Sequence, residues 1–343
     1  SAGWLALVSL SSVRVREPAP VGPEPTVGSE LSDAALLQAR GALTSFSTPD
    51  LTFGLFLPAS WQTPHASAAL HPVLVFLHGR GESGGFAVSY AQSLPWLLVS
   101  GNNETFARSF PFIVVAPQCP WRCAVANEWL SETLQSTASM VYKLLPRLGG
   151  DIQRIYLAGQ SMGGNGAWMF AAQQPRFFAA TVIVCGYAQQ QEADAGAMRV
   201  ARSPVAVYHS ADDSVIPVAA ADLMVDSLRR AQASRSSGKA FFSFGDVARR
   251  PHAGCIPGVH GCMVRYVRYE TAPGPPMPEY EHLIGHGSYE LAFRDADLYS
   301  WLLEQRCEKC GRNGGGMGEA SGGDDVVAPA PWRPLDSSSD HRL

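Results

Sequence analysis

The chain has 343 residues, a formal net charge of −4 from 26 Lys and Arg against 30 Asp and Glu, and 46% hydrophobic residues. That hydrophobic share supports a buried core and excludes a chain that is disordered throughout. The near balance of charge provides no global attraction for nucleic acid or an anionic membrane. We therefore expect no nucleic-acid partner. We also expect no stable membrane insertion, because the apolar runs fall far short of the roughly 20 residues that span a bilayer.

Composition divides the chain into three parts. Residues 1–44 include a proline-rich stretch at 16–30 and are expected to be a poorly structured leader and linker. Residues 45–306 are expected to form one folded domain with an insertion at 234–262. Residues 307–343 are rich in Gly, Pro, Asp and Ser, and we expect a disordered tail because such a segment buries too little apolar surface to fold.

Within the folded part, short β-branched runs alternate with longer amphipathic stretches. In chain order, strands are expected at 51–57, 73–77, 112–116, 155–158, 180–185, 205–209 and 264–269, and helices at 86–100, 128–145, 165–173, 219–231 and 289–304. Continuous apolar strands separated by helices predict an α/β fold with a mostly parallel central sheet and helices on both faces. Ligands of such sheets bind at the carboxyl ends of the strands, so functional residues are expected just after each strand.

The sharpest motif follows the strand at 155–158. It reads Gly159-Gln160-Ser161-Met162-Gly163-Gly164 and leads into a predicted helix, which is the G-x-S-x-G nucleophile elbow in its strand–turn–helix context. The glycines are needed because side chains at 159 and 163 would collide with the neighbouring strand or helix. The turn presents the Ser161 hydroxyl and aims the backbone N–H of Met162 at the place where an oxyanion would form.

A second oxyanion donor is expected upstream. The strand at 73–77 runs into His78-Gly79-Arg80-Gly81-Glu82, and a residue between glycines after a strand can turn its N–H toward the same site. We therefore expect the Arg80 amide to be this donor. His78 is expected to be structural, with hydrogen bonds inside the loop.

A nucleophilic serine requires a base, and the base requires an orienting acid, in the chain order Ser, Asp or Glu, His for this arrangement. Two aspartates, Asp212 and Asp213, follow the strand at 205–209. The turn closed by Val215-Ile216-Pro217 favours Asp213 facing the site and Asp212 facing outward. The alternative for either is an N-cap for the helix that starts near residue 219.

The base is chosen by position among four histidines. His252 and His260 lie in a Gly-, Cys- and Pro-rich excursion before the last strand, and His282 and His286 follow that strand. Gly285-His286-Gly287 places His286 in a flexible loop just before the terminal helix, from where an imidazole can reach back across the strand ends. We predict His286 as the base and keep His282 as the alternative.

Together these segments resemble the α/β-hydrolase superfamily, and within it the phospholipase/carboxylesterase, polyhydroxybutyrate-depolymerase and "predicted peptidase" esterase group. The resemblance covers about residues 50–305 and rests on segments 77–82, 115–120, 151–164, 175–180, 209–217 and 285–286. It implies a serine hydrolase that acts on a small-molecule carboxylic ester and uses no metal or organic cofactor. A thioesterase or peptidase uses the same groups, and a few proteins of this fold are non-catalytic binding modules.

Some features depart from the group or leave the substrate open. Ser210 replaces a usual glycine, Tyr289 replaces a frequent tryptophan, and the insertion at 234–262 carries Phe241, Phe242 and Phe244, a possible lid over the site. The residues expected to line the substrate pocket are Gln160, Gln118, Trp129 and Tyr289.

The seven cysteines form three pairs that are close in sequence, and Cys185 is left alone in an apolar strand. A different possibility for four of them is a four-thiolate zinc site, but their wide spacing disfavours it, and no metal is expected. The pairs are Cys119 with Cys123, Cys255 with Cys262, and Cys307 with Cys310.

Overall fold

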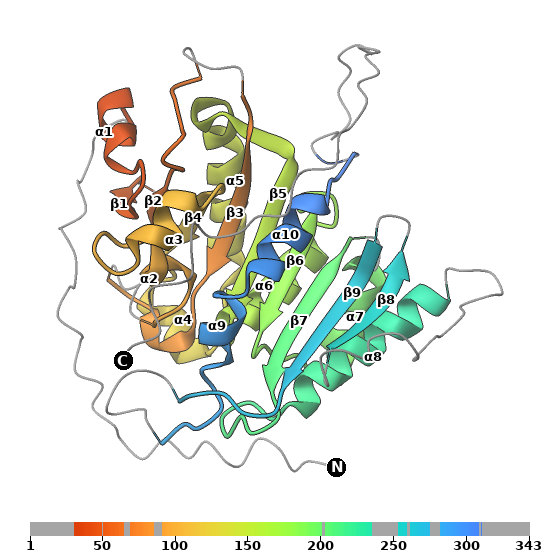
Figure 1. Cartoon of the computed structure of the whole chain (residues 1–343). Helices are drawn as coiled ribbons and strands as arrows, with labels where there is room; N and C mark the ends of the chain where they lie inside the picture. The colour runs from red at the N-terminus through yellow and green to blue at the C-terminus, as the bar shows by residue number, and fades with distance from the viewer. Residues whose placement is uncertain are drawn as a thin grey trace.

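The computed structural model describes residues 31–49, 51–64, 69–85, 91–200, 203–234, 253–258, 261–274, 282–308 and 310. These residues form a nine-stranded sheet in the order β1-β2-β4-β3-β5-β6-β7-β9-β8 (Figure 1). The strands are β1 (Thr44–Ser47), β2 (Thr52–Phe56), β3 (His71–Leu77), β4 (Ile113–Pro117), β5 (Gly150–Gln160), β6 (Ala180–Val184), β7 (Val205–Ser210), β8 (Ala253–Gly258) and β9 (Gly261–Tyr269).

The middle of the sheet is parallel and its two ends are antiparallel. Each neighbouring pair from β4 through β3, β5, β6 and β7 to β9 is parallel, whereas β1 with β2, β2 with β4, and β8 with β9 are antiparallel. In the β3–β5 pair, Leu77 lies opposite Gly159. The loop after β3 and the turn after β5 therefore leave the same edge of the sheet side by side.

Helices cover both faces of the sheet, as expected (Figure 1). Successive residues of β3 point to opposite faces of the sheet. Val75 and Leu77 belong to the hydrophobic cluster on one face, and Phe76 belongs to the cluster on the other. The first cluster includes residues of α1 (Asp33–Gln38), α5 (Ser131–Leu148), α6 (Met162–Gln173), α7 (Gln190–Val200) and α8 (Ala219–Ala233). The second includes residues of α2 (Leu94–Leu98), α3 (Glu104–Ser109), α9 (Ser288–Ala292) and α10 (Ala296–Glu304).

All seven expected strands are present, but two expected helices are wrong. The stretch 86–100 contains only α2 among its described residues, and 289–304 is divided into α9 and α10. The division occurs because the Asp295 side chain accepts the Asp297 N–H and so starts a new helix. The polar α7 and the four-residue β1 carry too weak a hydrophobic period to be recognised from sequence.

The folded unit starts earlier than residue 45. Helix α1 lies within the expected leader, its Leu36 is buried, and the Leu57 N–H donates to the Ala39 carbonyl at 2.8 Å. At the other end, the Cys307 N–H donates to the Gln153 carbonyl at 2.9 Å, and Cys307 is joined to Cys310 by a disulfide. Residues 1–30 and 311–343 lie outside the described part of the chain.

The expected insertion at 234–262 is partly regular structure. Its end contributes β8 and the start of β9, which form an antiparallel pair at one edge of the sheet. Phe241, Phe242 and Phe244, the residues of the expected lid, lie outside the described residues. Among the helices of the described chain, none is long and apolar enough to cross a bilayer.

Candidate active site

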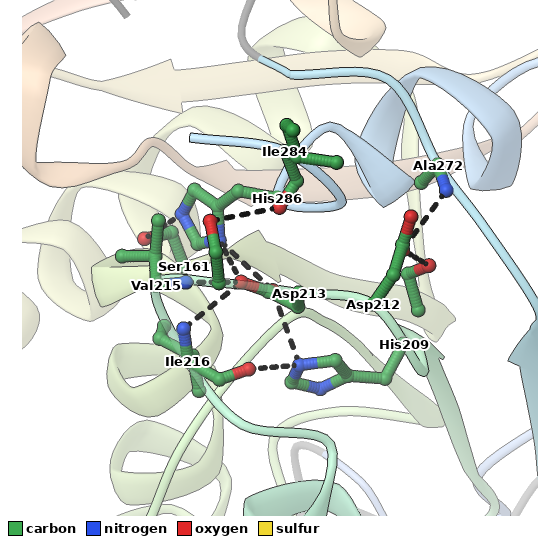
Figure 2. Close-up of polar contacts among 11 residues, drawn as sticks. Ser161, His209, Asp212, Asp213, Val215, Ile216, Ala272, Ile284 and His286 are labelled. Carbon is green, nitrogen blue, oxygen red and sulfur yellow. Dashed lines mark hydrogen bonds and ion pairs between the residues drawn. The ribbon is translucent and has the colours of Figure 1, made fainter. Parts of the chain in front are cut away.

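The expected nucleophile lies at the carboxyl end of β5. Ser161 follows Gln160, the last residue of this strand, and its backbone has φ 53° and ψ −122°. A positive φ is unfavourable for a residue with a side chain and persists only where the surrounding packing enforces it. The turn directs the half-buried Ser161 hydroxyl toward the loop that precedes α9 (Figure 2).

Two glycines allow this turn. A Cβ atom on Gly159 would lie 2.0 Å from the Gly163 carbonyl oxygen in α6, and one on Gly163 would lie 2.1 Å from the Leu77 carbonyl oxygen in β3. Both separations are far below van der Waals contact with rigid backbone atoms. The helix and the strand thus approach to a distance that only glycine permits, which is the packing that the motif predicted.

The structure brings Ser161, His286 and Asp213 together (Figure 2). Nε2 of His286 lies 3.0 Å from Oγ of Ser161, and Nδ1 lies 3.0 Å from Oδ2 and 3.2 Å from Oδ1 of Asp213. Because an ionised carboxylate only accepts hydrogen bonds, Nδ1 carries the imidazole proton. Nε2 is therefore free to accept the proton of the serine hydroxyl.

Asp213 is held by several donors. Its Oδ1 accepts the N–H groups of Val215 and Ile216, each at 2.9 Å. His209, also buried, has Nε2 3.2 Å from Oδ2 of Asp213 and 2.8 Å from the Ile216 carbonyl oxygen. Burial alone would raise the pKa of Asp213, but the hydrogen bonds from His209 and His286 outweigh it and hold the pKa well below the usual range. Asp213 therefore stays ionised beside the imidazole.

The neighbouring Asp212 points away from Ser161 and His286, as expected, and its side chain is hydrogen-bonded. Its Oδ1 accepts the Ala272 N–H at 3.1 Å and the Ser210 hydroxyl, so it ties the end of β7 to the segment after β9 (Figure 2). Further ties between the loops are Ser214 N–H to Ile284 O at 3.0 Å, Gly285 N–H to Ala272 O at 3.1 Å and Gly287 N–H to Pro273 O at 2.7 Å.

The loop after β3 runs next to the nucleophile. A Cβ atom on Gly79 would lie 3.6 Å from Cβ of Ser161. The buried His78 donates from Nδ1 to the Gly79 carbonyl at 2.7 Å and accepts the Cys119 N–H on Nε2 at 3.0 Å. Since the C=O and N–H of a trans peptide point in opposite directions, this contact with the Gly79 carbonyl sets the direction of the Arg80 N–H.

His78 has the structural role expected for it. Burial lowers its pKa to about 4, although the bond to Gly79 opposes the shift. The imidazole is therefore neutral at physiological pH, with one nitrogen donating and the other accepting, as the loop requires.

The two expected oxyanion donors both lie at helix starts. Arg80 is the first residue of the 3₁₀ helix η1 (Arg80–Glu82), and Met162 is the first residue of α6. The first N–H of a helix has no acceptor within that helix, so such groups are available to an anion. The side chain of Arg80 is exposed, and its Nε donates to the Ala124 carbonyl at 2.8 Å.

Sequence reasoning missed one buried carboxyl group in this loop. Glu82 is 3% exposed, and its oxygens accept N–H groups from Gly79 at 2.8 Å, Ala91 at 3.2 Å and the Gln160 side chain at 3.1 Å. Burial raises the pKa of Glu82 to about 8, although these three hydrogen bonds lower it in part. The signal in the sequence was a glutamate three residues after the start of a turn, the spacing of a capping box.

The four residues expected to line the substrate pocket are almost fully buried, and their contact with a substrate stays a prediction. Gln118 donates from Nε2 to the Glu82 carbonyl at 2.6 Å, and Trp129 donates from Nε1 to the His78 carbonyl at 3.1 Å. These side chains thus support the loop after β3, because their polar groups are satisfied by its backbone. The exposed fractions are 2% for Gln160, 5% for Gln118, 4% for Trp129 and 3% for Tyr289.

His282, the second candidate for the base, is exposed, and it is His286 whose imidazole contacts Ser161.

Two of the expected cysteine pairs are disulfides. Cys307 and Cys310 are joined, so neither is available as a zinc-binding thiolate, and Cys119 is joined to Cys123. The remaining histidines and the third cysteine pair lie outside the residues whose side chains are described: His252, His260, Cys255 and Cys262.

The sequence matches no known family profile and no curated relative. Among solved structures, a thermostable esterase aligns with a TM-score of 0.53 at 24% identity, over 77% of this chain and 62% of its own. An acylaminoacyl peptidase aligns with a TM-score of 0.50 at 15% identity, over 79% of this chain and 42% of its own. The chain thus spans less than two thirds of the length of both structures. Together with the strand order and the turn at Ser161, these similarities establish an α/β-hydrolase fold.

Proposed function

We propose that this protein is a serine hydrolase that cleaves carboxylic esters through Ser161, His286 and Asp213. The observation that supports this most directly is the 3.0 Å contact between Ser161 Oγ and His286 Nε2, with Asp213 on the other imidazole nitrogen. A nucleophile, a base and an orienting acid in hydrogen-bond contact are what acyl transfer by a serine requires.

The reaction proceeds in two steps. His286 Nε2 takes the hydroxyl proton as Ser161 Oγ attacks the ester carbonyl, and Asp213 keeps the imidazole in the reactive tautomer and stabilises its positive charge. The N–H groups of Met162 and Arg80 stabilise the oxyanion of the tetrahedral intermediate, with a typical contribution of about 3 kcal/mol for each donor. The intermediate collapses with loss of the alcohol, to which His286 returns the proton. Water then attacks the acyl-enzyme by the same route.

The bond that is cleaved defines the main alternative. The same groups hydrolyse thioesters and amides, and the similar structures include both an esterase and an acylaminoacyl peptidase. We favour a small-molecule ester, because several segments of this chain resemble the phospholipase/carboxylesterase group, and an ester needs less leaving-group activation than an amide. A non-catalytic binding role is disfavoured because the serine, histidine and aspartate are retained in hydrogen-bond contact.

Replacement of Ser161 by alanine tests the proposal. The variant should lose turnover of p-nitrophenyl acetate and labelling by a fluorophosphonate probe while keeping the far-UV circular dichroism of the wild type. Panels of ester, thioester and amide substrates on the wild type then rank the three bonds. Turnover retained by Ser161→Ala, or no fluorophosphonate labelling of the folded wild type, would refute the assignment.

A further inference from the structure

The carboxyl group of Glu82 joins the two halves of the proposed site. Its Oε2 accepts the Gly79 N–H at 2.8 Å and a Gln160 side-chain N–H at 3.1 Å. Gly79 directly precedes the proposed oxyanion donor Arg80, and Gln160 directly precedes the nucleophile Ser161. One oxygen atom therefore links the loop after β3 to the turn after β5.

The other oxygen of Glu82 fixes a third segment. Oε1 accepts the N–H of Ala91, the first described residue of the segment that leads into α2. The backbone carbonyl of Glu82 is held as well, because Gln118 donates to it at 2.6 Å. The carboxyl group is thus fixed from several directions and cannot swing without breaking several hydrogen bonds.

We propose that Glu82 is a positioning residue for the oxyanion site. It holds the Arg80 N–H at a set distance from Ser161. This inference rests on the proposed function. Glu82 orients the Gly79 N–H, and His78 orients the Gly79 carbonyl at 2.7 Å. Both peptide planes that flank Gly79 are therefore fixed. Since an oxyanion donor acts on the transition state and contributes little to substrate binding, the contribution of Glu82 should appear in kcat and hardly in KM.

The test replaces Glu82 by methionine, which keeps the length of the side chain but removes both acceptor oxygens. Glutamine would leave the contact in place, because its carbonyl oxygen can take the Oε2 position and accept from Gly79 and Gln160. At about pH 9, where Glu82 is ionised, the kcat for p-nitrophenyl acetate should fall about tenfold to a hundredfold, with KM within about threefold. The matched control is Glu192→Met. Glu192 also accepts a backbone N–H, from Gln189 at 2.9 Å, but it lies at the exposed start of α7. The kcat of this control variant should stay within about twofold of the wild type.

A second variant, Gln160→Met, removes only the donor at the end of β5 and keeps the test decisive if Glu82→Met does not fold. It should lower kcat in the same direction, and the double variant should lose less than the sum of the two effects, because both act through one contact. A folded Glu82→Met with unchanged kcat would overturn the proposal, as would a change confined to KM. A wild type that hydrolyses no ester would instead refute the proposed function, which is a distinguishable result.

Discussion

Replacing Asp213 by asparagine should invert the hydrogen bonding of His286 without changing the shape of the site. Oδ1 of Asp213 accepts two backbone N–H groups, from Val215 and Ile216, each at 2.9 Å. The carbonyl oxygen of asparagine must occupy this position, because an NH₂ group there would face two donors. The NH₂ group is then forced to the Oδ2 position, 3.0 Å from Nδ1 of His286. To accept from it, the imidazole must carry its proton on Nε2, where it can no longer take the Ser161 proton.

The size of the loss follows from this tautomer change. With the base almost absent, kcat should fall by about 10⁴-fold, which corresponds to about 5 kcal/mol of transition-state stabilisation. Steady-state hydrolysis of p-nitrophenyl acetate at pH 7.5 measures it, with thermal unfolding to show that the fold persists. The matched control is Asp212→Asn, because its carbonyl oxygen can still accept from Ala272 and Ser210. Its kcat should remain within about tenfold of the wild type.

Two results would refute this reasoning. The first is Asp213→Asn activity within about tenfold of the wild type, which would show that the acid does not select the tautomer of His286. The second is an equal loss in Asp212→Asn and Asp213→Asn, which would show that general damage to the loop accounts for the effect.

Two further predictions concern stability. Gly163→Ala should lower the free energy of unfolding by about 3 kcal/mol or more, because the new Cβ would lie 2.1 Å from the Leu77 carbonyl oxygen. The control Gly81→Ala has open space around its Cβ and should change the free energy of unfolding by less than about 1 kcal/mol. Equal urea denaturation midpoints for the two variants would contradict this. Because burial raises the pKa of Glu82 to about 8, the folded state binds a proton that the unfolded state has lost, and the free energy of unfolding should fall as pH rises from about 4.5 to 8. Urea titrations across this pH range should show that the free energy of unfolding falls less with pH in Glu82→Gln than in the wild type. An equal fall in the two proteins would contradict the assignment.

The central sheet and the hydrogen-bonded Ser–His–Asp group were predictable because their signals are local. Apolar strands bounded by turns gave all seven expected strands, and the Gly159–Gly163 spacing specifies a turn that no other residue type allows. The choice of Asp213 over Asp212 also followed from a local turn, since the N–H groups of residues 215 and 216 point back at one carboxylate.

The supporting residues were not predictable because their partners are distant in the chain. Glu82 takes donors from residues 91 and 160, and Asp212 takes one from residue 272, and no spacing rule connects such positions. The contacts of two expected pocket residues with the loop after β3 were missed for a related reason. Gln118 and Trp129 follow a strand end as ligand-binding residues do, but their side chains turn inward to the backbone of the loop after β3.

The hydrogen bonds between the loop that carries Asp213 and the loop that carries His286 determine how the site tolerates substitution. Ala272 and Pro273 are anchored on one side of the segment that precedes His286, and Ile284 and Gly285 are anchored on the other. The position of the imidazole is therefore set by contacts on both sides of the loop that carries it. A substitution that weakens one of these hydrogen bonds leaves the others to keep Nε2 of His286 within reach of the Ser161 hydroxyl.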